Sequence, residues 1–344
     1  MAVYTMIDEE ALHHLLRGYD IGQAVTCQGI TEGVENSNYK LTTTTGDFIL
    51  TIYEKRVSPK DLPFFMGLMT HLSQTGYPCP TPIADKKQCV LQTHANKPLA
   101  IVSFLQGQSH PTPTPSHCYQ AGAVLARLHL AAADFTGGKN NLRVNALGQS
   151  AWQGLFETCH ATAKTLTDNF KALDLKQTLA TIDADWPQSL PKGIIHADLF
   201  PDNVLFADSD NNRDNIKISG VIDFYFACYD FLAYDLAIMI NAWCFDTPDA
   251  LNREKSAALI DGYTSQRQLT TGEWEALPLL VRGAAMRFFL TRLYDWEHTP
   301  KDAQVKRLDP LDYWQRLLVH SEITHASQFR PTNAMPDKKP NRHA

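Results

Sequence analysis

One stretch of the chain groups side chains that could move a proton and hold a metal ion. His196, Asp198 and Asn203 follow the order H-x-D-x-x-x-x-N, with apolar, strand-like residues on both sides, and Asp223 ends a second apolar run. A carboxylate can orient a hydroxyl group and accept its proton, and amide and carboxylate oxygens are ligands that Mg²⁺ prefers. These residue types therefore predict proton transfer beside a magnesium site.

The order of the same residues matches the signature of phosphoryl transfer in kinases, an H-x-D-x-x-x-x-N loop followed by an Asp-Phe pair. Asp198 can deprotonate the attacking hydroxyl, while Asn203 and Asp223 can hold the Mg²⁺ ions that bridge the ATP phosphates. Turns between strands also collect aspartate, asparagine and proline, so either motif alone could be a plain turn. Both motifs in this order favour phosphoryl transfer.

The surrounding pattern predicts two lobes. Apolar and β-branched runs indicate an antiparallel meander at residues 24–30, 38–41 and 48–53, with further strands at 90–91 and 99–105. Beyond residue 116 the period is mainly helical, with separate helices expected at 272–281 and 283–296. We expect a β-rich N-lobe at residues 1–105, a helical C-lobe at 106–329, and a disordered tail at 330–344, which is rich in Pro, Asn and Lys.

The predicted N-lobe contains candidate nucleotide contacts. Asn36, Ser37 and Asn38 lie in the turn where kinases place a glycine-rich loop, and they can offer amides and hydroxyls to phosphate oxygens. Polar residues also cluster in ordinary hairpin turns, which is the alternative. The backbone from Ser103 to Leu105 can present N–H and C=O groups to an adenine edge, or it can be a plain buried strand.

Bulk properties exclude several classes of function. The net charge is −6 and no basic stripe is visible, which argues against nucleic acid as a partner. The seven cysteines form no C-x-x-C pair, which favours reduced thiols and argues against metal binding through sulfur. No secretory signal is visible, and no apolar run approaches the roughly 18 residues that span a bilayer. We therefore expect a cytoplasmic protein that does not bind membranes.

Longer motifs resemble a known family. The residues 125–129 (LARLH), 196–205 (HADLFPDNVL) and 221–224 (VIDF) are similar to the aminoglycoside-phosphotransferase and choline-kinase branch of the protein-kinase-like fold. Residues 33–39, 225–230 and 286–296 resemble the homoserine kinases of that branch. The resemblance covers about residues 4 to 320. It implies an α+β, protein-kinase-like bilobal fold and transfer of phosphate from ATP, with Mg²⁺, to the side-chain hydroxyl of L-homoserine, a step towards threonine.

The resemblance also implies roles for single residues. Asp198 is the base, Asn203 and Asp223 hold Mg²⁺, His196 braces the loop, and Asp235 steadies the backbone of the loop. 

One departure concerns the third strand, where kinases of this fold carry a lysine that grips the phosphates. Thr51 takes that position here, so Lys40, Lys55 or the Mg²⁺ ions would have to supply the charge.

Homoserine carries a carboxylate and an ammonium group, for which a site needs an arginine and an acid. Arg287 and Arg292 lie beside the apolar stripe of the predicted helix 283–296, and a surface ion pair is the alternative interpretation for either. Asp230 is the candidate partner of the ammonium.

Two other functions stay open at this point. Another small-molecule kinase of this fold could act on choline or ethanolamine, on an aminoglycoside or on a thiosugar; a choline cage could use Trp243, Tyr294 and Trp296. A nucleotide-binding pseudokinase that serves as an interaction module would explain Thr51, but such a module has no need to keep Asp198.

Overall fold

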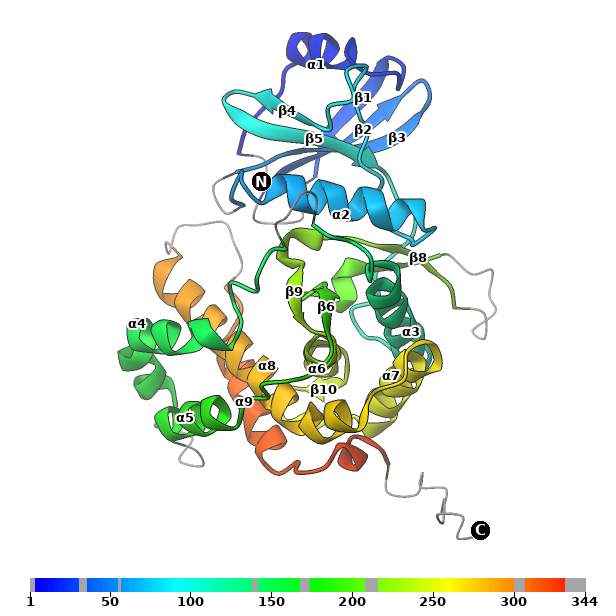
Figure 1. Ribbon diagram of the computed structural model, residues 1–344. Helices are drawn as coiled ribbons and strands as arrows, with labels where there is room; N and C mark the ends of the chain where they lie inside the picture. Colours follow the sequence, from blue (N-terminus) through cyan, green and yellow to red (C-terminus); the bar gives the residue numbers. More distant parts are fainter. Residues whose placement is uncertain are drawn as a thin grey trace, which may run out of the picture.

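A computed structural model describes residues 4–30, 36–54, 57–137, 142–167, 174–207, 216–299 and 307–331. Figure 1 shows a small β-rich lobe stacked on a larger helical lobe. The predicted α+β, two-lobed architecture is therefore confirmed. Lys55 and most of the predicted tail, from residue 332 onward, lie outside the described residues.

A five-stranded antiparallel sheet forms the N-lobe, in the order β1-β2-β3-β5-β4. Its strands are β1 (Ala24–Gly29), β2 (Ser37–Thr43), β3 (Gly46–Ile52), β4 (Leu91–His94) and β5 (Lys97–Ser103). Successive side chains of a strand point to opposite faces, so each strand serves two surfaces. One face packs under helix α1 (Glu9–Leu16), which Asp8 caps, and the other faces α2 (Leu62–Gln74) and the C-lobe.

The C-lobe is built from seven α-helices in the part of the chain that the structure describes. They are α3 (Pro115–Ala131), α4 (Gln149–Thr167), α5 (Leu175–Asp185), α6 (Leu232–Trp243), α7 (Arg253–Gln266), α8 (Thr271–His298) and α9 (Leu311–Ser321). Gly122 of α3 and Gly262 of α7 let these two helices touch, since a Cβ on Gly122 would lie 2.0 Å from the Leu259 carbonyl oxygen. Three short 3₁₀ segments are η1 (Pro201–Asn203), η2 (Phe224–Phe226) and η3 (Ala326–Phe329).

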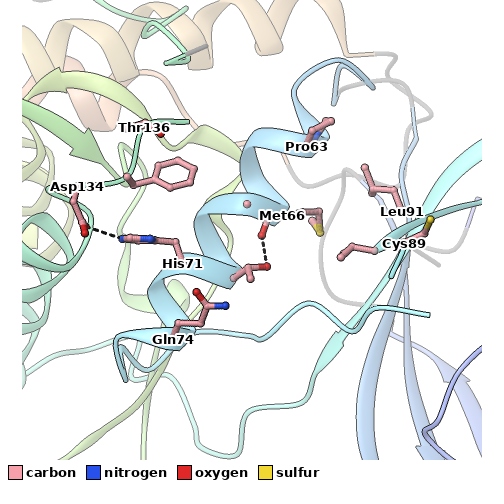
Figure 2. A pocket seen from close by; sticks show the side chains of 12 residues that line it. Pro63, Met66, His71, Gln74, Cys89, Leu91, Asp134 and Thr136 are labelled. Carbon is pink, nitrogen blue, oxygen red and sulfur yellow. Dashed lines mark hydrogen bonds and ion pairs between the residues drawn. The ribbon is translucent and has the colours of Figure 1, made fainter. Parts of the chain in front are cut away.

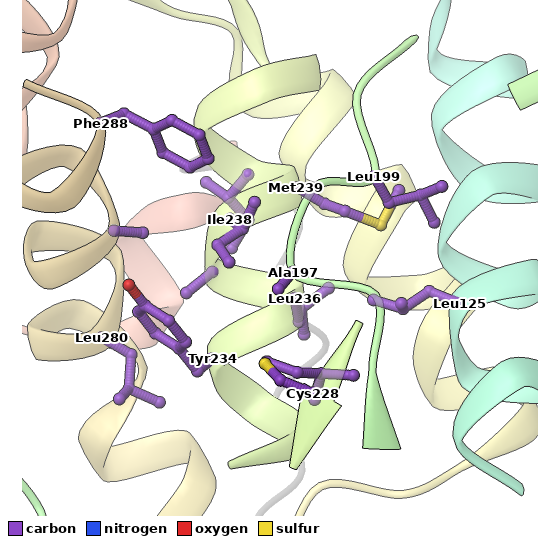
Figure 3. Close-up of a cluster of buried hydrophobic side chains, with 14 of the residues drawn as sticks. Leu125, Ala197, Leu199, Cys228, Tyr234, Leu236, Ile238, Met239, Leu280 and Phe288 are labelled. Carbon is purple, nitrogen blue, oxygen red and sulfur yellow. The ribbon is translucent and has the colours of Figure 1, made fainter. Parts of the chain in front are cut away.

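Among the described residues, three pairs of short strands complete the C-lobe. They join β6 (Lys192–Ile195) to β9 (Cys228–Phe231), β7 (Val204–Phe206) to β8 (Ile218–Val221), and β10 (Phe245–Thr247) to β11 (Ala250–Leu251). Helix α6 lies beneath the first of these pairs, and its apolar side chains form the centre of the lobe together with Ala197 and Leu199 (Figure 3). None of the described helices is long and apolar enough to cross a membrane.

The prediction of two helices at residues 272–281 and 283–296 is wrong, because α8 runs through both. Pro278 stands inside it, and Gly283 continues the helix instead of ending it. A Cβ at Gly283 would lie 2.3 Å from the Trp186 ring, so glycine serves here for close packing and not as a helix stop.

We propose that the boundary between the two lobes lies between residues 105 and 106, as the sequence predicts. The last strand of the N-lobe sheet ends at Ser103, and Gln108 already pairs with Phe206 of the C-lobe.

Candidate active site

The two strand pairs β6–β9 and β7–β8 bring the predicted catalytic and metal-binding residues together. Asp198 lies in the loop that leaves β6, Asn203 ends η1 before β7, and Asp223 follows β8. The Asn203 side-chain amide donates to the Asp198 carbonyl oxygen at 2.8 Å, and the Ile222 N–H donates to the Asn203 carbonyl oxygen at 3.0 Å. Residues far apart in the sequence thus form one hydrogen-bonded turn.

The backbone of this loop is held from below by Asp235. Its buried carboxylate accepts hydrogen bonds from the His196 N–H at 2.7 Å, the Ala197 N–H at 2.9 Å and the His129 ring at 3.1 Å. Burial alone would raise the pKa of the Asp235 carboxyl, but the hydrogen bond and charge of His129, with the loop, hold that pKa below its ordinary value. Asp235 therefore stays ionised and fixes the loop.

Ala197, between the histidine and the aspartate, has a left-handed backbone with φ of 63°. Few residues other than glycine adopt this conformation without strain. Arg287 of α8 is buried and donates to the Ala197 carbonyl oxygen at 2.7 Å. Asp235 on the N–H side and Arg287 on the C=O side hold the strained residue in place.

His196 connects the loop with the Asp223 turn. Its Nε2 lies 3.0 Å from the Ile222 carbonyl oxygen, and its ring packs beside Phe224. Burial lowers the pKa of the His196 imidazole, which favours a neutral ring. This geometry is that of a brace beneath the turn.

Asp223 also has a left-handed backbone, with φ of 64°, and its side chain is exposed. Because the Asn203 amide nitrogen is used within the loop, its oxygen is the atom that remains to bind a cation. An amide oxygen and a carboxylate are hard ligands, so the residues fit a magnesium ion.

The predicted nucleotide contacts divide between the two faces of the sheet. Asn36 accepts a hydrogen bond from the Glu54 N–H at 3.2 Å, and Asn38 accepts one from the Thr51 hydroxyl at 2.8 Å, on the face towards the C-lobe. Ser37 points to the α1 face, where its hydroxyl binds Glu54 and the N–H of Thr5. The alternation of the strand thus turns the Ser37 hydroxyl away from the face that Asn36 and Asn38 share.

The proposed adenine edge has one engaged and one open residue. Ser103 exchanges backbone and side-chain hydrogen bonds with Thr81. Leu105 has no backbone hydrogen bond to another described residue, and its side chain packs against Gly220 of the C-lobe. Leu105 is thus the better placed of the two.

Among the described residues, no lysine side chain contacts Thr51 through a hydrogen bond. Lys40 forms an ion pair with Asp47 at 3.5 Å and lies over the ring of Phe104, close in the chain to the proposed boundary between the lobes. Lys97 pairs with Glu54.

Comparison with known proteins agrees with this geometry. Residues 26–269 match the model of a family described as "Phosphotransferase enzyme family". The chain belongs to this family. This phosphotransferase is 49% identical over 330 residues to a homoserine kinase of Paramagnetospirillum magneticum, covering 96% of this chain and 99% of the relative. It is 48% identical over 324 residues to a homoserine kinase of Rhodospirillum rubrum, covering 94% and 97%.

Solved structures show the same fold at low sequence identity. The amicoumacin kinase hAmiN has a TM-score of 0.67 and 15% identity, covering 94% of this chain and 96% of that one. A spectinomycin phosphotransferase in complex with ADP and spectinomycin has a TM-score of 0.64 and 13% identity, covering 94% and 98%. The phosphotransferase thus has the kinase-like fold that its motifs predict.

In the phosphotransferase, two of the predicted acceptor residues lie near one buried phenol. Burial raises the pKa of Tyr234, the nearby Arg287 guanidinium lowers it and the Asp230 carboxylate raises it. Asp230 accepts hydrogen bonds from the Asn145 amide at 2.7 Å and from the Phe231 N–H at 2.8 Å. A cation and an anion therefore both lie near Tyr234.

Arg292 of the phosphotransferase lies further along α8. It forms an ion pair with Asp312 of α9 at 3.1 Å and covers the Tyr313 ring. The ring of Tyr313 stacks on Phe288, which in turn packs against Phe200 of the loop that carries Asp198. The sequence pattern did not point to Tyr313 or Asn145, because their partners come from segments distant in the chain.

A separate groove lies on the outer side of α2 (Figure 2). It encloses about 670 Å³ between α2, the segment before β4 and the residues after α3, and His71 forms an ion pair with Asp134 within it. The catalytic loop does not line this groove.

Proposed function

We propose that this phosphotransferase is an ATP-dependent homoserine kinase that converts L-homoserine to O-phospho-L-homoserine. The observation that carries the proposal is the connected turn of Asp198, Asn203 and Asp223 on the braced loop. The choice of homoserine as the acceptor is supported by the high identity, over nearly the whole chain, to proteins named homoserine kinase.

The chemistry would divide among these residues as follows. Asp198 orients the homoserine hydroxyl and takes its proton as the oxygen bonds to the γ-phosphorus of ATP, while the bond from that phosphorus to the bridging oxygen breaks and ADP leaves. Asn203, through its side-chain oxygen, and Asp223 hold Mg²⁺, which when bound neutralises charge on the phosphates. His196 and Asp235 keep the loop in place. ATP would lie under the β2–β3 face with its adenine edge at Leu105, near Asn36, Asn38 and the backbone of Ser37 and Ser103.

Acceptor recognition is proposed for Arg287 and Asp230, which both lie near Tyr234, with the homoserine carboxylate towards the arginine and the ammonium towards the aspartate. Arg292 is the second candidate for the carboxylate, and to bind it the guanidinium would have to share its charge with Asp312. The proposal also places the enzyme in the cytoplasm, where its seven free cysteines stay reduced.

A panel of acceptors tests this function. Purified protein with ATP and Mg²⁺ should release ADP rapidly with L-homoserine, and far more slowly with choline, ethanolamine or kanamycin. Equal turnover of all acceptors, or faster turnover of another one, would reject the homoserine assignment. Nucleotide binding without turnover of any acceptor would instead support the pseudokinase module.

A further inference from the structure

Thr51 belongs to a group of hydroxyl-bearing side chains at the junction of the two lobes. Thr51 and the residue two positions on, Tyr53, share the face of β3 that looks towards the C-lobe. The Tyr53 hydroxyl lies 3.0 Å from the Tyr225 hydroxyl of the C-lobe, and the two rings meet edge to face. A direct hydrogen bond therefore joins the end of β3 to η2.

Tyr225 is also the residue on which three elements meet. Its ring packs edge to face against Phe65 of α2, with centroids 5.7 Å apart, as well as against Tyr53. The Tyr53 side chain is almost fully buried, and burial is the main cause that raises its pKa well above the ordinary value. Tyr225 is half-buried, so breaking this hydrogen bond leaves the buried Tyr53 hydroxyl, or the half-buried Tyr225 hydroxyl, with little or no water to bind.

The Asp223 turn needs support on both sides. Asp223 has an unfavourable left-handed backbone, and the residue before it is fixed to the C-lobe through His196 and Asn203. Two residues after Asp223, Tyr225 makes the contact with β3. Strained conformations persist only where the surroundings hold them, so this contact can decide the direction of the Asp223 carboxylate.

We propose that the Tyr53–Tyr225 hydroxyl pair is a positioning contact that fixes the Asp223 carboxylate relative to the nucleotide-covering sheet. The pair provides a neutral connection between the lobes at the place where a strand lysine is missing. This inference rests on the proposed kinase function for its use in catalysis, but its test in nucleotide binding does not depend on which acceptor is phosphorylated.

Calorimetric titration of ADP, with saturating Mg²⁺ and with EDTA, tests the proposal on Tyr53→Phe, Tyr225→Phe and the double variant. The gain in ADP affinity from Mg²⁺ should fall by roughly five- to thirty-fold in each single variant, since a buried or half-buried hydroxyl loses its partner. Metal-free ADP affinity should stay within about twofold. The double variant should lose no more than either single variant, because the two residues act as one contact.

Tyr77→Phe is the matched control, because its buried hydroxyl donates to the Val124 carbonyl oxygen of α3 at 3.3 Å and not to a residue of β3 or η2. It should leave the gain from Mg²⁺ unchanged. Thermal unfolding of every variant reports any general loss of structure. An unchanged Mg²⁺ gain in both single variants would overturn the proposal, and so would an equal loss of affinity with and without Mg²⁺. Failure of homoserine turnover in the wild type would reject the proposed function alone.

Discussion

Replacing Asp235 by asparagine should destabilise the C-lobe. The carboxylate accepts three hydrogen bonds, from the His196 N–H, the Ala197 N–H and the His129 ring. An asparagine has one side-chain oxygen, which in the place of Oδ2 can still accept from His196 and His129, while its NH₂ group faces the Ala197 N–H. One buried donor would then be unpaired, so the free energy of unfolding should fall by about 1–3 kcal/mol. This is a large share of the roughly 5–15 kcal/mol that stabilises a typical protein.

Urea unfolding followed by tryptophan fluorescence measures this loss, and Trp243 is a suitable reporter because its indole donates to the Leu199 carbonyl oxygen at 2.7 Å. The control is Asp261→Asn, whose partly exposed carboxylate pairs with Arg330 and should contribute less than about 1 kcal/mol. A loss below about 1 kcal/mol in Asp235→Asn would refute the reasoning that the loop backbone depends on this carboxylate.

Three further predictions concern the same loop and its surroundings. Asp198→Asn should lower kcat by about 10²–10⁴-fold while MgADP affinity, measured by calorimetry, changes little; a rate near wild type would remove Asp198 from the mechanism. Ala197→Gly should keep activity and raise the free energy of unfolding or leave it unchanged, whereas Ala197→Val should lose about 1–3 kcal/mol, as urea unfolding can measure. The stability that Asp235 contributes should be fully present above about pH 4, the ordinary range of an aspartate pKa. It should decline as the pH falls through the depressed pKa of Asp235 in the folded state. The difference in the midpoint of unfolding between wild type and Asp235→Asn should therefore become smaller below about pH 4.

The sequence was most informative where chemistry depends on local spacing. His196, Asp198 and Asn203 lie within one loop, and their order alone predicted that they act together with Asp223. The structure joins this loop to the Asp223 turn through the hydrogen bonds of His196 and Asn203 with Ile222. The fold class followed from the change between strand and helix periods. Boundaries were harder: the sequence suggested a break between residues 281 and 283, and the close packing of Gly283 against the Trp186 ring within one continuous helix could not be predicted from it.

Contacts between distant segments could not be predicted in this way. The sequence gives no sign that Tyr53 lies against Tyr225, since 172 positions separate them. The side of the sheet on which Ser37 lies could have been predicted from strand alternation, had the start of β2 been placed at residue 37 and not at 38. The roles of the site residues remain predictions that the variants above test.

The loop that carries Asp198 is held through its backbone, by Asp235 of α6 and Arg287 of α8. Both contacts bind peptide N–H and C=O groups, which every amino acid except proline supplies. In evolutionary terms, side chains that face the acceptor, other than Arg287, can therefore change without disturbing the position of the base. A fold built this way can acquire new alcohol substrates by mutation of the acceptor side while its phosphoryl-transfer machinery is inherited intact.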